Sequence, residues 1–434
     1  MVVAAPPPLR TRLAVVAGRA ASRASRLLGR GHGAVIGGRV AMKVDPGVLG
    51  RLVAGRPVTV VTGTNGKTTT TCLVAAALGA ERTVASNRGA NLPSGMIEPA
   101  SSAGADELVF EVDELYVPQV VREARACVLV LLNLSRDQLD RITEVRRIAE
   151  RWRALIAEVD WPLTVVANVD DPLVVWAVGD HRDVVWVGAG SRWREDSALC
   201  PSCARVREIA ADGSWHCECG LSRPSPSWTV DVAGIHLPDG AVLPLALPLP
   251  GDFNRTNATM AVAVASARAV DPVAAVARLA TVTDVAGRYR IIDVDGRSVR
   301  LLMGKNPASW TETMHVLTPS AASTAGDAGA VGPTDAAAAD ERTPVVVCLN
   351  ARGADGTDTS WIWDVPFELL AGRVLVASGD RRLDLSLRMQ VAGLAHTVAD
   401  DAVTAVRSVP VGPVDLVATY TAFHDVLEQL DVDW

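Results

Sequence analysis

The stretch that most constrains the fold of this chain is residues 58–72, Val-Thr-Val-Val-Thr-Gly-Thr-Asn-Gly-Lys-Thr-Thr-Thr-Thr-Cys. Its β-branched residues predict a strand, its glycines a tight turn, and the residues after Lys67 the start of a helix. This order is typical of phosphate-binding loops, where glycine lets backbone amides approach phosphate oxygens and the helix N-terminus favours negative charge. An ordinary Gly-rich turn is the alternative, and the combination of strand, Gly-Lys-Thr and helix disfavours it.

The loop predicts how a nucleotide would be held. Lys67 is expected to reach the β- and γ-phosphates, and the Thr68 hydroxyl to hold Mg²⁺. The standard pattern has a glycine at position 61, where this chain has Val61, so the loop is a short Gly-Thr-Asn-Gly-Lys-Thr variant. We expect ATP to contact Gly63, Thr64, Asn65, Gly66, Lys67, Thr68 and Thr69.

The length and net charge of the chain limit the kinds of protein that it can be. A chain of 434 residues is expected to form two or three domains, and its net charge of −7 argues against a general nucleic-acid binder. It contains no apolar run of about 18 residues and no signal-peptide cleavage pattern. We therefore expect a cytoplasmic protein.

The N-terminal segment, residues 1–44, is basic. Residues 1–40 contain seven arginines and no acidic residue, and a helical projection separates apolar positions from arginines. Such a helix can lie on an anionic membrane surface. It can also pack on the next domain with a solvated arginine face, which we favour, and a transit peptide has the same composition.

The following segment, residues 45–284, alternates strand and helix patterns and predicts a doubly wound α/β domain. An apolar strand that begins at Glu107 ends in Glu111-Val-Asp-Glu, at the edge of the sheet where ligands bind. Solvated acids are common at strand ends, but beside a phosphate-binding loop Glu111 becomes a candidate Mg²⁺ ligand.

A cysteine cluster at about residues 198–221 interrupts this domain. Cys200 and Cys203 have the usual two-residue spacing of a zinc ribbon, whereas Cys217 and Cys219 are separated by one residue. We expect Zn²⁺ to be bound by Cys200, Cys203 and Cys219, with Cys217 or His216 as the fourth ligand. The alternative is a degenerate ribbon that has lost its metal. Nothing in the sequence ties this segment to the nucleotide site, so we expect a structural role.

A third segment, residues 285–434, follows a linker and predicts a smaller α/β domain. Its strand and helix patterns are interrupted by an Ala-, Gly-, Ser- and Thr-rich stretch at about residues 318–343, which predicts a disordered surface insertion.

Seven motifs in order resemble the central and C-terminal domains of the Mur ligase superfamily, which includes folylpolyglutamate synthetase. They are Gly63–Thr68, Glu111–Glu114, Asn133–Arg141, Asn168–Pro172, Phe253–Asn257, Gly287-Arg288 and Asn306–Ser309. The resemblance implies a P-loop doubly wound central domain and a smaller α/β C-terminal domain. It also implies that Asn254 and Asn257 make adenine-side contacts and that Arg288 helps to orient ATP.

Two departures point to one branch of the superfamily. The chain lacks room for the usual N-terminal UDP-binding domain, and Leu-Met-Gly-Lys precedes Asn306 in place of the common Asp-Tyr-Ala-His. Together with the cysteine cluster, they resemble the MurT-type ligases. This resemblance implies ATP-dependent amidation of the D-glutamate α-carboxylate of lipid II to D-isoglutamine, with ammonia from a GatD-type glutaminase partner, at the inner face of the cytoplasmic membrane.

The residues are consistent with an external ammonia source. No cysteine lies in a Gly-x-Cys-x-Gly elbow, so the chain is expected to lack its own glutaminase. A Cys–His glutaminase usually needs a carboxylate to orient its histidine. The resemblance implies that one of Asp355, Asp358 and Asp364 supplies it; we favour Asp358, which follows the turn and lies beside two hydroxyl residues. The alternative is that all three are turn and cap residues.

Two other functions are weighed against this prediction. A Mur- or folylpolyglutamate-type ligase that adds an amino acid is disfavoured by the cysteine cluster and the missing domain. A non-catalytic P-loop scaffold is disfavoured by the intact Lys67, Thr68 and Glu111.

Overall fold

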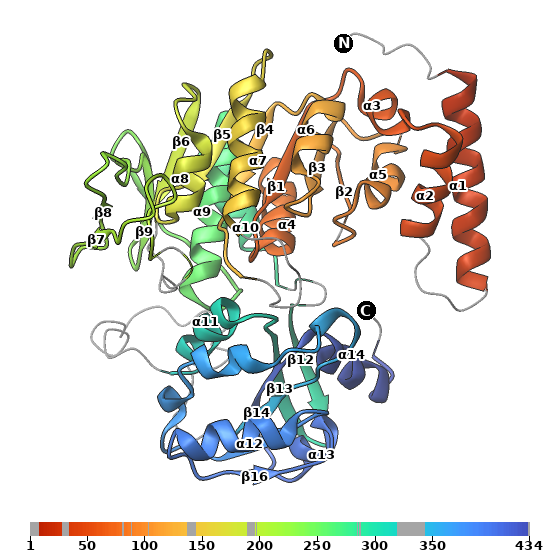
Figure 1. Ribbon diagram of the computed structural model, residues 1–434. Helices are drawn as coiled ribbons and strands as arrows, with labels where there is room; N and C mark the ends of the chain where they lie inside the picture. Colours follow the sequence, from red (N-terminus) through yellow and green to blue (C-terminus); the bar gives the residue numbers. More distant parts are fainter. Residues whose placement is uncertain are drawn as a thin grey trace. The chain divides into compact units, whose positions relative to one another are not determined.

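The structure is a computed structural model that describes residues 8–27, 34–79, 82–87, 89–102, 104–136, 145–188, 196, 198–283, 285, 288–318 and 343–432. These residues form two compact units, the first from residues up to 135, 143–247 and 253–282, and the second from residues 136–142, 248–252 and 283 onward (Figure 1). The predicted insertion at 318–343 falls almost entirely on residues 319–342, which lie outside the described residues. Residues 137–141 and Gly287 also lie outside them.

The first unit is built on a nine-stranded sheet in the order β11-β10-β9-β6-β5-β4-β1-β3-β2. Seven strands are parallel, and β10 and β11 add an antiparallel edge. The predicted doubly wound α/β class is confirmed. The strands are β1 (Val58–Thr62), β2 (Val84–Ser86), β3 (Glu107–Glu111), β4 (Val128–Leu131), β5 (Thr164–Asn168), β6 (Val184–Gly188), β9 (Trp228–Asp231), β10 (Gly234–His236) and β11 (Val242–Leu243).

The central strands are buried on both faces, as helices on both sides of a parallel sheet require. Every residue of β1, β3 and β4 is buried. The helices of this unit that follow the N-terminal pair are α3 (Val48–Val53), α4 (Lys67–Leu78), α5 (Ile97–Ala100), α6 (Val117–Ala124), α7 (Val145–Glu158), α8 (Pro172–Val178), α9 (Asp252–Ala267) and α10 (Pro272–Leu279), with the 3₁₀ helix η1 (Pro93–Met96). The parallel strands all end at one edge, where the loops of the site lie.

An N-terminal helical pair, α1 (Leu9–Leu27) and α2 (Ala34–Val44), belongs to the first unit. The two helices approach closely because glycines face each other: a Cβ added to Gly18 would lie 2.7 Å from the carbonyl oxygen of Gly37. The Thr11 hydroxyl donates to the Asp45 carboxylate at 2.7 Å, and Arg51 pairs with the same carboxylate. This segment is therefore packed on the domain that follows it.

The cysteine segment lies between β6 and β9. Its secondary structure is slight, a hairpin of two-residue strands, β7 (Glu208–Ile209) and β8 (Trp215–His216).

The second unit has a six-stranded sheet in the order β12-β13-β17-β14-β15-β16, parallel except for the β12–β13 pair. Its strands are β12 (Tyr289–Val294), β13 (Arg297–Met303), β14 (Val345–Cys348), β15 (Leu375–Ser378), β16 (Thr397–Val398) and β17 (Pro413–Ala418). Its helices are α11 (Pro307–Leu317), α12 (Arg382–Val391), α13 (Ala402–Arg407) and α14 (Tyr420–Gln429), with 3₁₀ turns η3 (Gly353–Asp355), η4 (Ser360–Asp364) and η5 (Phe367–Leu370). Separate apolar cores form around Phe423 and around Trp310.

The sequence patterns predict most of the long helices and strands, and they miss several strands at the edges of the two sheets. The sequence did not predict β12 or the β10–β11 pair. Among the described residues, no helix combines the length and the apolar character that crossing a membrane would need.

Candidate nucleotide and metal sites

The loop between β1 and α4 has a backbone that only glycine fits at two positions. Gly63 has φ +142° and Gly66 has φ +85°, in the region that L side chains rarely adopt. A Cβ at Gly63 would lie 2.9 Å from the backbone nitrogen of Asn133, and one at Gly66 would lie 2.8 Å from the Asn257 Oδ1. The loop thus needs glycine both for its turn and for close packing.

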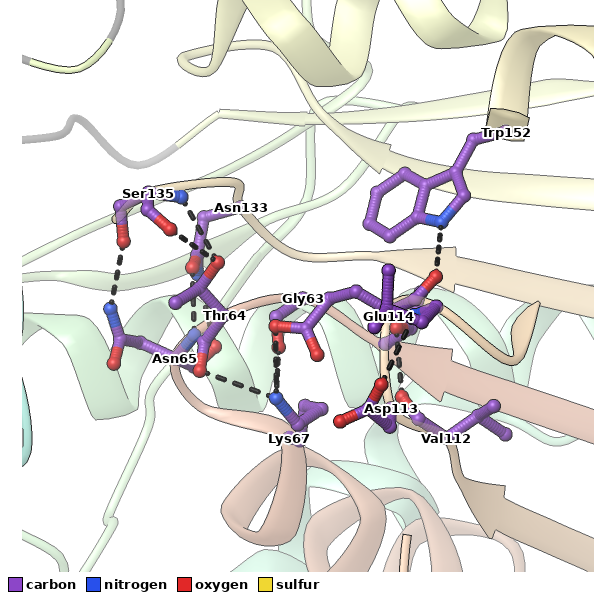
Figure 2. Close-up of polar contacts among 12 residues, drawn as sticks. Gly63, Thr64, Asn65, Lys67, Val112, Asp113, Glu114, Asn133, Ser135 and Trp152 are labelled. Atoms are coloured by element: carbon purple, nitrogen blue, oxygen red, sulfur yellow. Dashed lines mark hydrogen bonds and ion pairs between the residues drawn. The ribbon is translucent and has the colours of Figure 1, made fainter. Parts of the chain in front are cut away.

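The loop is fastened to the residues that follow β4 (Figure 2). The Thr64 backbone N–H donates to the Asn133 carbonyl at 2.9 Å, and the Asn133 side chain bonds both the N–H and the C=O of Asn65, at 2.9 and 3.0 Å. The Thr64 hydroxyl accepts the Ser135 N–H at 3.0 Å. The loop is therefore shaped by the chain itself. The sequence predicted no separate role for Asn133 beyond its motif, and its position directly after an apolar strand is the signal that points to this role.

Lys67 begins α4 and is 4% exposed. Its Nζ donates to the Gly63 carbonyl at 2.6 Å and forms an ion pair with the Glu114 Oε1 at 3.2 Å (Figure 2). The Glu114 backbone carbonyl in turn accepts the indole N–H of Trp152 at 3.0 Å. Glu114, for which the sequence predicted no separate role, thus holds the ammonium group within the loop.

The N-terminus of α4 has backbone N–H groups that can bind an anion. Its cap residue, Gly66, provides no side-chain hydrogen bond, and the Thr70 N–H makes a backbone bond to the Gly66 carbonyl at 2.8 Å. The amides of the first turn of a helix have no partner within that helix, and phosphate oxygens can accept from them. Thr68 is half-buried and Thr69 is buried in this turn. The predicted phosphate-contacting residues are thus together on one loop.

Glu111 is the last residue of β3, and the Asn87 side chain hydrogen-bonds both of its backbone polar groups. Its N–H donates to the Asn87 Oδ1 at 2.8 Å, and its C=O accepts from the Asn87 Nδ2 at 2.7 Å. The side chain is 2% exposed, and its Oε2 has no hydrogen-bond partner within the described part of the chain. A buried carboxylate oxygen left without a donor is costly unless a cation binds it. The residue therefore fits its predicted role as a Mg²⁺ ligand.

Asn254 and Asn257 lie on the first turns of α9, each 6% exposed. The Asn257 Nδ2 lies 3.3 Å from the Asn254 Oδ1, and Asn257 faces Gly66 of the loop. The structure thus brings Asn257 to the phosphate side of the site. The predicted adenine contacts of both residues stay a prediction.

Four cysteines converge in the segment between β6 and β9. The Sγ atoms of Cys200, Cys203, Cys217 and Cys219 all lie within 4.8 Å of one another. The Cys200–Cys219 and Cys203–Cys217 pairs are 3.6 and 3.4 Å apart. Thiolates at the Zn–S distance of a tetrahedral site are about 3.8 Å apart, so the cluster fits one Zn²⁺ ion. His216 instead lies 3.3 Å from Glu208 and its side chain is 62% exposed, which favours Cys217 as the fourth ligand.

The cysteine segment contacts the residues that follow β5, at the same edge of the sheet as the loop. The Trp215 indole N–H donates to the Val169 carbonyl at 3.1 Å, and Arg223 pairs with Asp170 at 2.8 Å. The adjacent Asp171 accepts the Leu134 N–H at 2.6 Å, directly before the Ser135 that contacts Thr64. Tertiary contacts that the sequence does not show thus connect this segment to residues beside the loop, and its structural role stays a prediction.

The three aspartates of the second unit differ in environment. Asp355 is 7% exposed and accepts the Thr421 N–H at the start of α14, and burial raises the pKa of its carboxyl. Asp358 is exposed, and a hydrogen bond from the Ser360 N–H lowers the pKa of its carboxyl. Asp364 is also exposed. Asp355 therefore has a structural partner that occupies it, and Asp358 and Asp364 are accessible.

Arg288 lies at the start of the second unit, half-buried, with its Nη1 3.4 Å from the Met303 sulfur. The Asn306 side chain caps α11 by accepting the Ser309 N–H at 2.9 Å. The predicted contact of Arg288 with ATP stays a prediction.

Two family descriptions match the chain in order. Residues 61–265 match the Mur ligase middle domain, and residues 303–423 match the MurT ligase C-terminal domain. The first covers the loop, Glu111 and the cysteine cluster, and the second covers the three aspartates.

Curated relatives and solved structures agree with this domain order. The subunit named "Lipid II isoglutaminyl synthase (glutamine-hydrolyzing) subunit MurT" is 26% identical in Staphylococcus aureus strain N315, over 98% of both chains. The protein of that name in Streptococcus pneumoniae R6 is 26% identical over 89% of this chain and 88% of that one.

Solved structures share the fold. A pseudomurein peptide ligase type C from Methanothermus fervidus has a TM-score of 0.63 at 19% identity, over 87% of this chain and 79% of that chain. MurF from Acinetobacter baumannii has a TM-score of 0.60 at 18% identity, over 90% and 80%. The chain therefore carries a Mur ligase middle domain at residues 61–265, followed by a MurT-type C-terminal domain at residues 303–423.

Proposed function

We propose that this protein is the ligase subunit of an enzyme that amidates the α-carboxylate of D-glutamate in the lipid II stem peptide, forming D-isoglutamine. The relatives named for lipid II isoglutaminyl synthase match it across nearly its whole length. ATP is the energy source and ammonia the nucleophile. A GatD-type glutaminase would supply the ammonia, because the relatives are named as subunits of a glutamine-hydrolysing synthase.

The observation that carries this proposal is an intact phosphate site in the same chain as a MurT-type C-terminal domain. A carboxylate is a poor electrophile at neutral pH. Transfer of the γ-phosphoryl group to one of its oxygens gives an acyl phosphate and ADP, and attack by ammonia at the carbonyl carbon then expels phosphate. Catalysis of phosphoryl transfer is mostly positioning and charge neutralisation, which the loop is built to perform.

Each residue of the loop has a task in this reaction. The amides at the start of α4 would bind phosphate oxygens, and Lys67 would exchange its contact with Glu114 for the β- and γ-phosphates. Mg²⁺, held by Thr68 and Glu111, would neutralise phosphate charge when bound. Zn²⁺, held by Cys200, Cys203, Cys217 and Cys219, would stabilise the inserted segment.

The reaction class can be tested on the purified chain with ATP, Mg²⁺, lipid II and ammonium chloride. We expect mass spectrometry to find a single amide and one ADP formed per product. Incorporation of an added amino acid in place of ammonia would support the amino-acid-adding ligase. A chain that binds ATP and turns over nothing would support the scaffold.

The partner role of Asp358 requires a second experiment, with a GatD-type glutaminase present. Asp358 is accessible, whereas Asp355 is engaged by Thr421. Asp358→Ala should leave complex formation and ATP binding intact and lower glutamine-driven amidation by about 10⁴-fold, the loss seen when a triad carboxylate is removed. Added ammonia should restore the product, because only the ammonia supply is lost.

Asp364→Ala is the matched control, since it removes another exposed carboxylate of the same segment. If Asp358→Ala amidates normally with glutamine and Asp364→Ala does not, the role belongs to Asp364. We place the reaction in the cytoplasm at the inner face of the membrane, where ATP meets a lipid-carried peptide.

A further inference from the structure

The outer face of α1 is apolar. Leu9, Leu13, Val16 and Leu27 are 70, 56, 63 and 88% exposed, and the exposed Ala20 lies among them. At about 100° per residue these five positions fall within a narrow sector of the helix. We call this row, Leu9, Leu13, Val16, Ala20 and Leu27, the α1 stripe. Surface helices of globular proteins normally turn such a row toward the core.

The opposite face of α1 holds the helix in place with small and polar residues. Thr11, Ala14, Gly18 and Ser25 are buried. Rotation of the helix to bury the stripe would bring large side chains against α2, where even a Cβ at Gly18 lies only 2.7 Å from a carbonyl oxygen. The hydrogen bond between Thr11 and Asp45 fixes the same orientation. Figure 1 shows α1 as the outermost helix at its end of the first unit. The stripe is thus held outward by the packing of the chain.

Arginines flank the stripe. Arg12, Arg19, Arg23 and Arg26 are exposed and project to one side of it. Residues 1–44 contain seven arginines, one lysine and no acidic residue, in a chain whose net charge is −7. Within the described ranges, no acidic side chain pairs with Arg12, Arg19 or Arg23. Positive charge is therefore concentrated beside the α1 stripe.

We propose that the α1 stripe and its flanking arginines dock this protein on an anionic phospholipid bilayer. A helix in a bilayer interface buries an apolar face among acyl chains while Lys and Arg contact acidic headgroups. The 19 residues of α1 give a straight contact of about 28 Å. A second copy of this chain is disfavoured as the occupant, because two such faces would bring like charges together.

The use of such docking rests on the proposed function, because an enzyme reaches a lipid-carried substrate from the membrane surface. Its physical basis is independent of that function. Docking would hold the enzyme beside its substrate and would leave the chemistry at the loop unchanged.

The test is flotation of the full-length chain with vesicles of phosphatidylcholine alone or with phosphatidylglycerol added. We expect binding only to the anionic vesicles, weakened by salt. Leu9→Ser/Leu13→Ser/Val16→Ser should abolish flotation. Arg12→Gln/Arg19→Gln/Arg23→Gln should weaken it by about fivefold for each arginine removed.

A matched control removes exposed apolar residues elsewhere. Val232 and Val411 are 95 and 70% exposed, and Val232→Ser/Val411→Ser should float as the unmodified chain does. Flotation of the stripe variant at the unmodified level, or failure of the unmodified chain to float, would overturn the proposal. So would binding of the stripe to a protein partner without any effect on flotation.

Amidation separates this proposal from the proposed function. The stripe variant should amidate a lipid-free stem peptide at the unmodified rate and should amidate lipid II in anionic vesicles more slowly. If the unmodified chain floats but amidates neither substrate, docking stands and the proposed function fails. If it amidates the lipid-free peptide but does not float, the reverse holds.

Discussion

The phosphate loop and the cysteine segment are both irregular stretches at one edge of the same sheet, and they are stabilised in different ways. The loop residues Thr64 and Asn65 are hydrogen-bonded to Asn133 and Ser135, and the strand before them is fully buried. The cysteine segment has only two-residue strands, and many of its side chains are exposed. The loop is held by hydrogen bonds within the chain, whereas the cysteine segment has little secondary structure and brings four thiols within 4.8 Å of one another.

This difference indicates that the loop determines mainly the chemistry and the cysteine segment mainly local stability. Donors held in a buried loop need little rearrangement to bind a ligand, beyond the exchange of Glu114 for phosphate at Lys67, so substitutions there should reduce chemistry more than stability. A small segment without a core would gain its folding free energy from the Zn²⁺ that we propose for it, so substitutions there should reduce local stability more than chemistry.

The largest expected effect is that of Lys67→Ala. It removes the ammonium group that the loop positions, and we expect ammonia-driven amidation and ATP turnover to fall by about a thousandfold. The circular dichroism spectrum should be unchanged. Lys43→Ala, at an exposed position of α2, is the matched control and should retain full activity. Normal amidation by Lys67→Ala would remove the basis for assigning the loop to ATP.

The next effect concerns the metal. The purified chain should contain about one Zn²⁺, and Cys200→Ser or a chelator should release it and increase hydrogen exchange throughout residues 198–221. ATP turnover should change only a few-fold. Cys127→Ser is the control, because its side chain donates to the Val58 carbonyl, which a hydroxyl can also do. Absence of zinc from freshly purified protein, or unchanged exchange without it, would show that the segment is ordered by other contacts.

Local patterns in the sequence predicted the parts of both sites that local chemistry determines. Gly63, Gly66 and Lys67 follow from the requirements of a phosphate loop, and the cysteine pairs follow from zinc coordination. The Lys67–Glu114 ion pair depends instead on how far the chain runs beyond β3, which lies beside β1 with Val61 opposite Glu111.

The choice between Cys217 and His216 and the outward face of α1 likewise depend on tertiary packing. His216 pairs with Glu208 on the opposite strand of a hairpin whose strands are two residues long. In the sequence, the spacing allowed either Cys217 or His216 to be the fourth zinc ligand. The sequence separates apolar positions from arginines along α1 and favours packing on the next domain. The helix is packed there, but through Thr11, Ala14 and Gly18, because close glycine contacts with α2 compete successfully with burial of the leucines.

A smaller effect is expected from Asn133→Ala, which leaves the Asn65 backbone N–H and C=O without their side-chain partner. Loss of these two bonds should loosen the loop and raise the KM for ATP by about tenfold, with a smaller change in kcat. Ser135→Ala removes only the 3.3 Å contact with the Asn65 side-chain amide and should raise the KM less than twofold. Equal effects of the two substitutions would indicate that the loop is not held by Asn133.

The smallest effect is expected from Trp215→Phe, which tests whether the cysteine segment influences the loop. The substitution removes the indole N–H bond to the Val169 carbonyl while most of the buried ring volume remains. One lost hydrogen bond of this kind costs about 1 kcal/mol, so hydrogen exchange in residues 198–221 should rise about fivefold while zinc stays bound. The KM for ATP should change less than it does in Asn133→Ala, since Asp170 still pairs with Arg223 and Asp171 still accepts the Leu134 N–H. A KM change as large as that of Asn133→Ala would mean that the segment helps to shape the nucleotide site, and the contrast between the two regions would then have to be abandoned.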